Sequence, residues 1–190
     1  MKIVLKLLLK DILPDRGTVK VQKTIEFSYF DQNRSDLKPN DTLKDVMVPN
    51  GGDYIEVRGK MRHVYGYLKE FMFDPKNVLD SVSSLSGGQK RKLVIALALL
   101  SEPKVLLLDE PFAALDVLTI KMLQEIIVNL QQENQITICI CDHQARDLLA
   151  CVDVAMILSN GKIVAQDTPS NLVNNINAKN AYFGDSFKIN

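Results

Sequence analysis

The spacing of apolar residues divides the chain into segments of two kinds. Apolar positions recur at helical spacing over residues 3–12, and residues 89–100 have strong helix propensity. Short uninterrupted apolar runs occupy residues 105–108 and 136–141, and such runs are typical of strands buried on both faces of a parallel sheet. Because these strands alternate with helical segments, the pattern predicts an α/β fold with a largely parallel sheet.

The same patterns predict the remaining elements. Residues 18–29 alternate apolar and polar positions as short strands do, and residues 33–53 are polar and rich in turn-forming residues. The Asn160-Gly161 turn predicts a hairpin between a strand at 154–158 and a partner at 163–165. Further helices are predicted over residues 64–73, 117–132 and 144–151.

Charge balance and the shortness of the apolar runs limit the partners to be expected. Lys plus Arg equal Asp plus Glu at 23 each, so net charge gives no reason to expect DNA or an anionic membrane as partner. The longest apolar run, residues 94–100, is far shorter than the roughly 20 residues that span a bilayer. Lys6 and Lys10 interrupt the N-terminal apolar stretch, which therefore makes a poor signal peptide. With three cysteines, an odd number suited to free thiols, the chain is expected in the cytoplasm.

The first segment with candidate chemistry is Leu85-Ser86-Gly87-Gly88-Gln89, directly before a predicted helix. Its two glycines let backbone N–H groups approach an anion, and the Ser86 hydroxyl can donate a hydrogen bond to it. The start of a helix also carries partial positive charge. These features predict a phosphate-binding loop. Taken alone, an ordinary glycine-containing turn before a helix is the commoner explanation.

An acid pair follows the apolar run at 105–108. Asp109 and Glu110 stand at the carboxyl end of this predicted strand, where α/β sheets bind their ligands. Asp109 is a candidate ligand of Mg²⁺ and Glu110 a candidate general base. The alternative is a capping or solvated acid pair, which is frequent at strand ends.

Two further positions follow the same logic. Asp142-His143 comes directly after the run at 136–141, and His143 is a candidate to contact a phosphate or to orient water. A lone histidine is more often a surface or core residue. Asp116, in Ala114-Leu115-Asp116, is most simply the N-cap of the next helix.

In order and spacing these segments resemble the ATP-binding-cassette (ABC) ATPases. The matching segments are the Leu-Ser-Gly-Gly-Gln signature at 85–89, Asp-Glu-Pro at 109–111, Ala-Leu-Asp at 114–116 and Asp-His at 142–143. The resemblance implies a P-loop NTPase-like core that binds ATP and Mg²⁺ and forms a head-to-tail dimer. ATP would lie between the Walker motifs of one subunit and the signature of the other.

The resemblance also implies roles for single residues. ATP bound to the partner subunit would contact the signature, and nucleotide contacts are assigned to Ser86, Gly87, Gly88, Gln89 and Asp116. In the chain's own site, Asp109 would hold the metal, while Glu110 and His143 would be catalytic. Gln32, in Tyr-Phe-Asp-Gln at 29–32, matches the Q-loop glutamine, which senses Mg²⁺ and contacts the nucleotide site.

One motif of the family does not occur in the sequence. A Walker A loop has the form Gly-x-x-x-x-Gly-Lys-Ser/Thr, and its backbone amides and lysine supply most of the phosphate binding. The two Gly-Lys pairs, Gly59-Lys60 and Gly161-Lys162, are followed by Met and Ile and lack the preceding glycine. Residues 5–9 resemble the helix after Walker A, so an N-terminally truncated core is expected.

The family frame predicts four segments. Residues 1–32 would be the remnant of the ATPase core after the Walker A position, ending at the Q-loop, and residues 33–84 a variable, helical insert. Residues 85–167 would form the core from the signature to the His-switch, and residues 168–190 a C-terminal helix and tail.

The two halves resemble different members of the family. Residues 5–84 resemble the second cassette of ABC-F proteins, a soluble class associated with ribosomes. Residues 85–190 resemble the ATPase of the lipopolysaccharide-export transporter, including Phe112 after Asp-Glu-Pro, Asp142 before the histidine and a Tyr-x-Gly-x-x-Phe tail. ABC-F cassettes usually have Asp-Glu-Pro-Thr-Asn and Ser-His-Asp at these places. The change of resemblance at the shared signature motivates the hypothesis of a fused remnant of two related genes.

Three functional interpretations follow. The chain is the ATP-binding subunit of a lipid-exporting transporter, docked through permease subunits on the inner face of the inner membrane, with impaired ATP hydrolysis. Alternatively, it is an ABC-F-like factor that works on the ribosome, or a non-catalytic subunit that donates only its signature to a partner's ATP site.

Two minor interpretations were weighed as well. Zinc binding by Cys139, Cys141, His143 and Cys151 is disfavoured, because C-x-C is not the spacing of structural zinc sites. Aromatic residues within 64–73 have the chemistry to stack on RNA bases, but near-helical spacing favours a packing face.

Overall fold

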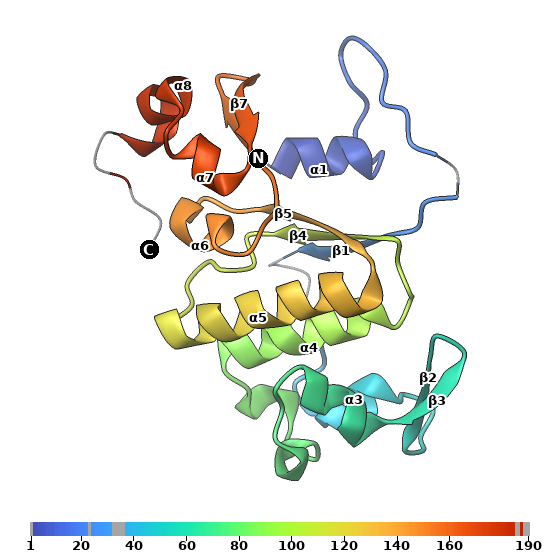
Figure 1. Ribbon diagram of the computed structural model, residues 1–190. Coiled ribbons are helices and arrows are strands. Elements are labelled where there is room, and N and C mark those ends of the chain that lie inside the picture. Colours follow the sequence, from blue (N-terminus) through green and yellow to red (C-terminus); the bar gives the residue numbers. More distant parts are fainter. Residues whose placement is uncertain (1, 23, 32–36, 185–186, 188–190) are drawn as a thin grey trace.

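A three-stranded parallel sheet lies at the centre of the computed structural model, which describes residues 2–22, 24–31, 37–184 and 187 (Figure 1). The strand order is β1 (Phe27–Asp31), β4 (Val105–Asp109) and β5 (Thr137–Cys141). In the register, Tyr29 pairs with Leu107 and Leu107 with Cys139, so the carboxyl ends of the strands meet at one edge. The predicted α/β fold with a parallel sheet is therefore confirmed.

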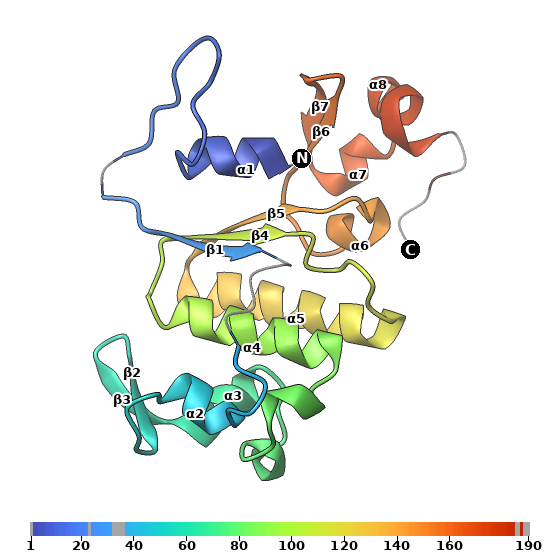
Figure 2. The same ribbon diagram turned by 180° about the vertical axis from the view of Figure 1, so that it is seen from behind.

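Helices cover both faces of this sheet, as Figures 1 and 2 show from opposite sides. On one face, Leu5 of α1 (Lys2–Leu8) packs with Leu107 and Cys141. On the other, α4 (Gly87–Leu99) and α5 (Val117–Asn134) pack against the alternate side chains Leu106 and Leu108. Successive strand residues point to opposite faces, which is why fully apolar strands need cover on both sides.

The segment between β1 and α4 contributes to the larger core. It contains α2 (Leu43–Met47), the hairpin β2 (Tyr54–Val57) and β3 (Lys60–His63), α3 (Val64–Glu70), and the 3-10 turns Pro75–Asn77 and Val82–Ser84. Tyr67, Phe71 and Phe73 are buried there, and the Tyr67 hydroxyl donates to the Ala96 carbonyl over 2.8 Å. These aromatic rings form a packing face, so stacking on RNA bases is not available to them.

The C-terminal part has a smaller core of its own. After α6 (Ala145–Leu149), β6 (Ala155–Ser159) and β7 (Lys162–Asp167) form the predicted hairpin. The chain continues through α7 (Pro169–Leu172), α8 (Ile176–Ala178) and one π-helical turn, Lys179–Phe183. Leu149, Leu172 and Ala178 are buried together against the hairpin.

One local prediction was wrong, and one hairpin was missed. Residues 18–22 are not a strand, because within the described residues they have no ladder partner, and Val19 and Val21 are only half-buried. The hairpin at 54–63 was not predicted, because its turn is Arg58-Gly59 rather than the expected Asn-Gly. Both turn residues have positive φ, 55° and 68°, as a type I′ turn requires. No helix in the described part of the chain has the length and hydropathy that crossing a bilayer requires.

Candidate functional site

The carboxyl edge of the sheet brings Asp109 and the end of β5 together. Asp109 ends β4 and pairs in register with Cys141, the last residue of β5. The Asp109 side chain is almost fully buried, at 1% exposure, and accepts a hydrogen bond from the Tyr29 hydroxyl over 3.2 Å. A buried carboxylate is costly unless it has partners, and the Tyr29 hydroxyl is one such partner.

Glu110 adopts an unusual backbone conformation. Its φ of 51° lies in the left-handed region, which costs a residue with a Cβ atom about 1–3 kcal/mol. Its N–H donates to the Cys141 carbonyl over 2.7 Å, which extends the β4–β5 ladder by one bond. The strained conformation is therefore fixed from the neighbouring strand, and it turns the chain sharply after Asp109.

Asp142 joins the two loops that follow β4 and β5. Its side chain is fully buried and accepts hydrogen bonds from the N–H of Phe112 (3.0 Å) and the N–H of Gln144 (2.9 Å). The Gln144 side-chain amide donates in turn to the Phe112 carbonyl over 2.9 Å. We call these three residues the loop brace. The sequence alone predicts no role for Asp142 or Gln144. The one feature that could have indicated a structural role is a carboxylate directly after a buried strand.

His143 lies next to the loop brace but faces outward. Its side chain is 66% exposed, with Nδ1 at 3.6 Å from Asp142 Oδ1. The Tyr182 hydroxyl donates to the His143 carbonyl over 2.8 Å, and burial together with the charge of Asp142 raises the pKa of Tyr182. The C-terminal segment therefore contacts the backbone of the candidate switch histidine, which sequence analysis did not foresee.

The signature segment is a second, separate cluster at the start of α4. Ser86 and Gln89 form a capping box, with the Gln89 N–H donating to Ser86 Oγ (3.2 Å) and the Ser86 N–H to Gln89 Oε1 (2.8 Å). Ser86 and Gly87 are exposed. In an α-helix the first N–H groups have no intrahelical acceptor, so those of Gly87 and Gly88 are suited to an anion.

Gly88 and Asp116 connect this cluster to α5. Gly88 is buried, and a Cβ atom on it would meet Thr119 Cγ2 at 2.3 Å. Asp116 is the N-cap of α5 and accepts hydrogen bonds from the Thr119 N–H (3.0 Å) and hydroxyl (2.6 Å). Its hydrogen bonds to Thr119 lower the pKa of Asp116. The cap predicted for Asp116 is confirmed, and the residue assigned to nucleotide binding lies beside the signature.

The groups present fit a magnesium nucleotide in part. Mg²⁺ commonly takes one or two protein carboxylates plus phosphate and water oxygens, and Asp109 and Glu110 supply carboxylates at the sheet edge. Gln32 lies outside the described residues, so its assignments to metal and nucleotide stay predictions. Among the described residues no three His, Cys, Asp or Glu side chains converge on a metal position, which leaves the zinc interpretation without support.

The thiols near this edge differ in character. Hydrogen bonding with the Cys141 thiol lowers the pKa of Cys139 to about 7, although burial alone would raise it. The same hydrogen bond and burial both raise the pKa of Cys141. Burial raises the pKa of Cys151 to about 12. Cys139 is therefore the thiol that ionises most readily near neutral pH.

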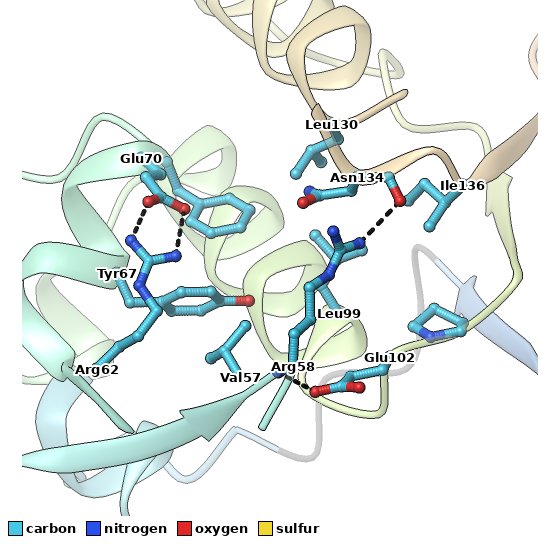
Figure 3. Close-up of a pocket in the computed structure, with 12 residues that line it drawn as sticks. Val57, Arg58, Arg62, Tyr67, Glu70, Leu99, Glu102, Leu130, Asn134 and Ile136 are labelled. Atoms are coloured by element: carbon cyan, nitrogen blue, oxygen red, sulfur yellow. Dashed lines mark hydrogen bonds and ion pairs between the residues drawn. The ribbon is translucent and has the colours of Figure 1, made fainter. Parts of the chain in front are cut away.

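Two hollows lie away from the candidate residues. Figure 3 shows a cavity of about 30 Å³ at the hairpin, where the Arg58 guanidinium donates to the Asn134 carbonyl (2.8 Å) and Arg62 pairs with Glu70. This cavity has room for about one water molecule. The Arg58–Asn134 hydrogen bond beside it connects the hairpin to α5. A larger, open hollow of about 590 Å³ lies between β1, residues 37–49 and α4. Leu37, Val46 and Val94 line it, with Asp41 and Asp45.

Comparison with known proteins gives a consistent result. The sequence profile of the family described as ABC transporter matches residues 3–113. The ATP-binding protein Uup of Haemophilus influenzae, an ABC-F protein, is 43% identical over 127 residues, which cover 67% of this chain and 20% of Uup. The lipopolysaccharide export system ATP-binding protein LptB of the same organism is 36% identical over 118 residues, 62% of this chain and 48% of LptB.

A solved structure gives the same fold. The dimeric ATP-binding cassette MJ0796, in a post-hydrolysis state bound to ADP and Pi, superposes with a TM-score of 0.57 at 24% identity, covering 76% of this chain and 63% of that one. The chain thus spans about a fifth to a half of the curated relatives just named. Both groups named from the sequence motifs are among its relatives.

Proposed function

Because this chain belongs to the ABC transporter family, we propose that it acts as the ATP-binding subunit of a transporter similar to the lipopolysaccharide-export ATPase, with impaired ATP hydrolysis of its own. In this proposal Asp109 holds Mg²⁺, Glu110 acts as general base and His143 contacts the nucleotide. Ser86, Gly87, Gly88 and Gln89 contact ATP bound to a partner cassette.

The loop brace is the observation that carries the transporter assignment. Phe112 and Asp142 are two positions at which the sequence follows the lipid-exporter pattern rather than the ABC-F pattern. They are in direct contact, since Asp142 Oδ2 accepts from the Phe112 N–H over 3.0 Å. The donor is the backbone N–H of residue 112, so this bond depends on aspartate at 142 and not on phenylalanine at 112. Serine at 142 has a shorter side chain and no charge, so Asp142 is the residue that supports descent of the catalytic edge from the transporter type.

The proposed impairment of hydrolysis is supported by the lack of a Walker A motif within these 190 residues. Most of the phosphate binding in these ATPases comes from the amides and lysine of the Walker A loop, which this stretch of chain does not contain. Each charge-assisted hydrogen bond to phosphate is worth about 1.5–3 kcal/mol, so losing several removes most of the affinity of an ordinary ATP site. The exposed signature does not depend on that loop, so it can still serve a partner.

A membrane partner is proposed for the open hollow. Its volume of about 590 Å³ lies within the usual range of ligand pockets, about 300–1,000 Å³. Its lining combines apolar side chains with two acids and one base, Asp41, Asp45 and Lys38, and this net negative charge suits an amphipathic segment with basic residues. We assign this segment to a permease subunit.

The test is fractionation of the tagged full chain expressed in its own host. The proposal expects the chain in the membrane fraction, and expects Val46→Glu in the hollow to release it. Gln132→Glu, which adds the same charge to the exposed side of α5, should stay on the membrane. Recovery in the soluble fraction for the unmodified chain would rule out the transporter assignment.

A ribosome-associated ABC-F function is the second candidate. The observation in its favour is the higher identity to Uup, 43% against 36% for LptB, over a longer stretch. Sedimentation with ribosomes at low salt, unchanged by Val46→Glu, would establish this alternative. A chain that only donates its signature would restore hydrolysis to a cassette with an intact Walker A loop and a disabled signature.

A further inference from the structure

Two cysteines share one face of the edge of the central sheet. Cys139 and Cys141 are two residues apart in β5, so their side chains point to the same side, toward α1. Leu5 and Leu107 are buried beside them, and Leu9 packs partly against the same cluster. Both thiols are free, and both residues belong to this one cluster on the same face of β5.

The spacing on a strand decides what these thiols can do. Equivalent atoms of residues i and i+2 are about 6.6 Å apart, twice the rise per residue of a parallel strand. A disulfide requires Cβ atoms about 3.5–4.5 Å apart, so it would have to bend the strand. Two thiolates on opposite sides of one ion, each at a metal–sulfur distance of about 2.3 Å, lie about 4.6 Å apart. Side chains that lean toward each other reach this separation without moving the backbone.

We propose that Cys139 and Cys141 form a two-thiolate binding site for a soft, two-coordinate metal ion of the Cu(I) or Ag(I) class. Thiolate ligands select soft ions, and the surrounding cluster is apolar except for Tyr29, whose hydroxyl donates to Asp109. No third Cys, His, Asp or Glu joins the pair in a common site among the described residues, which disfavours zinc, an ion that takes four ligands in structural sites. Binding replaces two thiol protons by one ion, releases both protons and changes no oxidation state.

The half-buried position of Cys139 provides access to this site. Cys139 is partly exposed while Cys141 is buried, so an ion reaches Cys139 first and is then closed in by Cys141. The Cys141 carbonyl also accepts the Glu110 N–H. The site therefore lies directly behind the candidate catalytic edge, but it does not depend on the proposed function.

The experiment is a titration of the reduced, full-length chain with Ag⁺ under anaerobic conditions, followed by native mass spectrometry and a count of reactive thiols. One tightly bound ion per chain and loss of two reactive thiols are expected. Cys139→Ser and Cys141→Ser should each weaken binding by about 100-fold or more, because two-point attachment is lost. Cys151→Ser is the matched control and should bind as the unmodified chain does.

Two outcomes would overturn the site. One is binding that survives either Cys139→Ser or Cys141→Ser, and the other is binding that is lost in Cys151→Ser. Displacement of Ag⁺ by an equal concentration of Zn²⁺ would contradict the two-coordinate geometry. If a serine variant unfolds by circular dichroism, Cys139→Ala and Cys141→Ala replace it, and phenylarsine oxide, which needs two adjacent thiols, reports on the unmodified chain.

Discussion

The two clusters of candidate residues are held in different ways. At the sheet edge, the buried Asp142 side chain accepts one hydrogen bond across 30 residues of sequence, from the Phe112 N–H. At the signature, Ser86 and Gln89 bond to each other within one helical turn, and the surrounding surface is exposed. One cluster depends on the tertiary fold, and the other is built almost entirely from its own sequence.

This difference matches the two tasks proposed for the clusters. Residues that act on a nucleotide in the same chain need fixed relative positions, which buried bonds between loops provide. A segment that contacts nucleotide on a partner needs to stay accessible, and a capped helix start presents N–H groups outward without further support. The signature touches the rest of the fold through Gly88, against Thr119, and through Leu85, which is buried in the larger core.

The largest effect is expected from removing the loop brace. Asp142→Ala leaves one buried and one half-buried backbone donor without their acceptor, and hydrogen bonds to a charged group are worth about 1.5–3 kcal/mol each. We expect a loss of about 3 kcal/mol in the free energy of unfolding, measured by urea denaturation. Asp153→Ala, an exposed acid nearby, is the control. Equal stability of the two variants would show that the edge is not braced.

A smaller effect is expected where the signature meets α5. Gly88→Ala would place a Cβ atom 2.3 Å from Thr119 Cγ2, and such overpacking costs about 1–3 kcal/mol. Adding Thr119→Ser, which removes that methyl group, should restore most of the loss. Gly87→Ala, whose Cβ atom would have nothing within 4 Å, should be neutral in the same denaturation experiment. A double variant no more stable than Gly88→Ala would refute this contact.

Removing the local cap should cost less again. Ser86→Ala breaks the capping box, and the loss of such a cap costs about 1 kcal/mol. Ser84→Ala lies outside the signature and should change stability by less than about 0.5 kcal/mol. If Ser86→Ala cost as much as Asp142→Ala, the proposed contrast between the clusters would be wrong.

The smallest effect concerns the charge on Asp116. Hydrogen bonds to Thr119 lower its pKa in the folded state, so the charged form stabilises the fold above the unfolded pKa, and this contribution is lost as the pH falls through the folded value. Asn also caps helices well, so Asp116→Asn isolates the charge. The melting temperatures of the two proteins should differ slightly at pH 7 and converge once the pH has fallen below the lowered folded pKa of Asp116. A gap that persists at low pH would point to geometry instead.

Sequence patterns were sufficient wherever neighbours in sequence decide the outcome. The apolar runs of β4 and β5, the helices around them, and the cap at Asp116 follow from local spacing. The position of Asp109, Glu110 and His143 at one edge follows from parallel pairing. The role of Asp142 could not be predicted, because its hydrogen-bond donor Phe112 is brought near it only by the packing of two loops. Likewise, the hairpin at Arg58-Gly59 could not be predicted, because arginine rarely adopts the positive φ that its turn requires.

We propose that these 190 residues carry the edge of an ABC ATPase but do not turn over ATP alone. The most direct test is phosphate release from ATP and Mg²⁺ by the purified chain, beside Glu110→Gln. We expect both proteins to give the same rate as buffer. Turnover above background that disappears in Glu110→Gln would contradict the claim and make the chain a working ATPase.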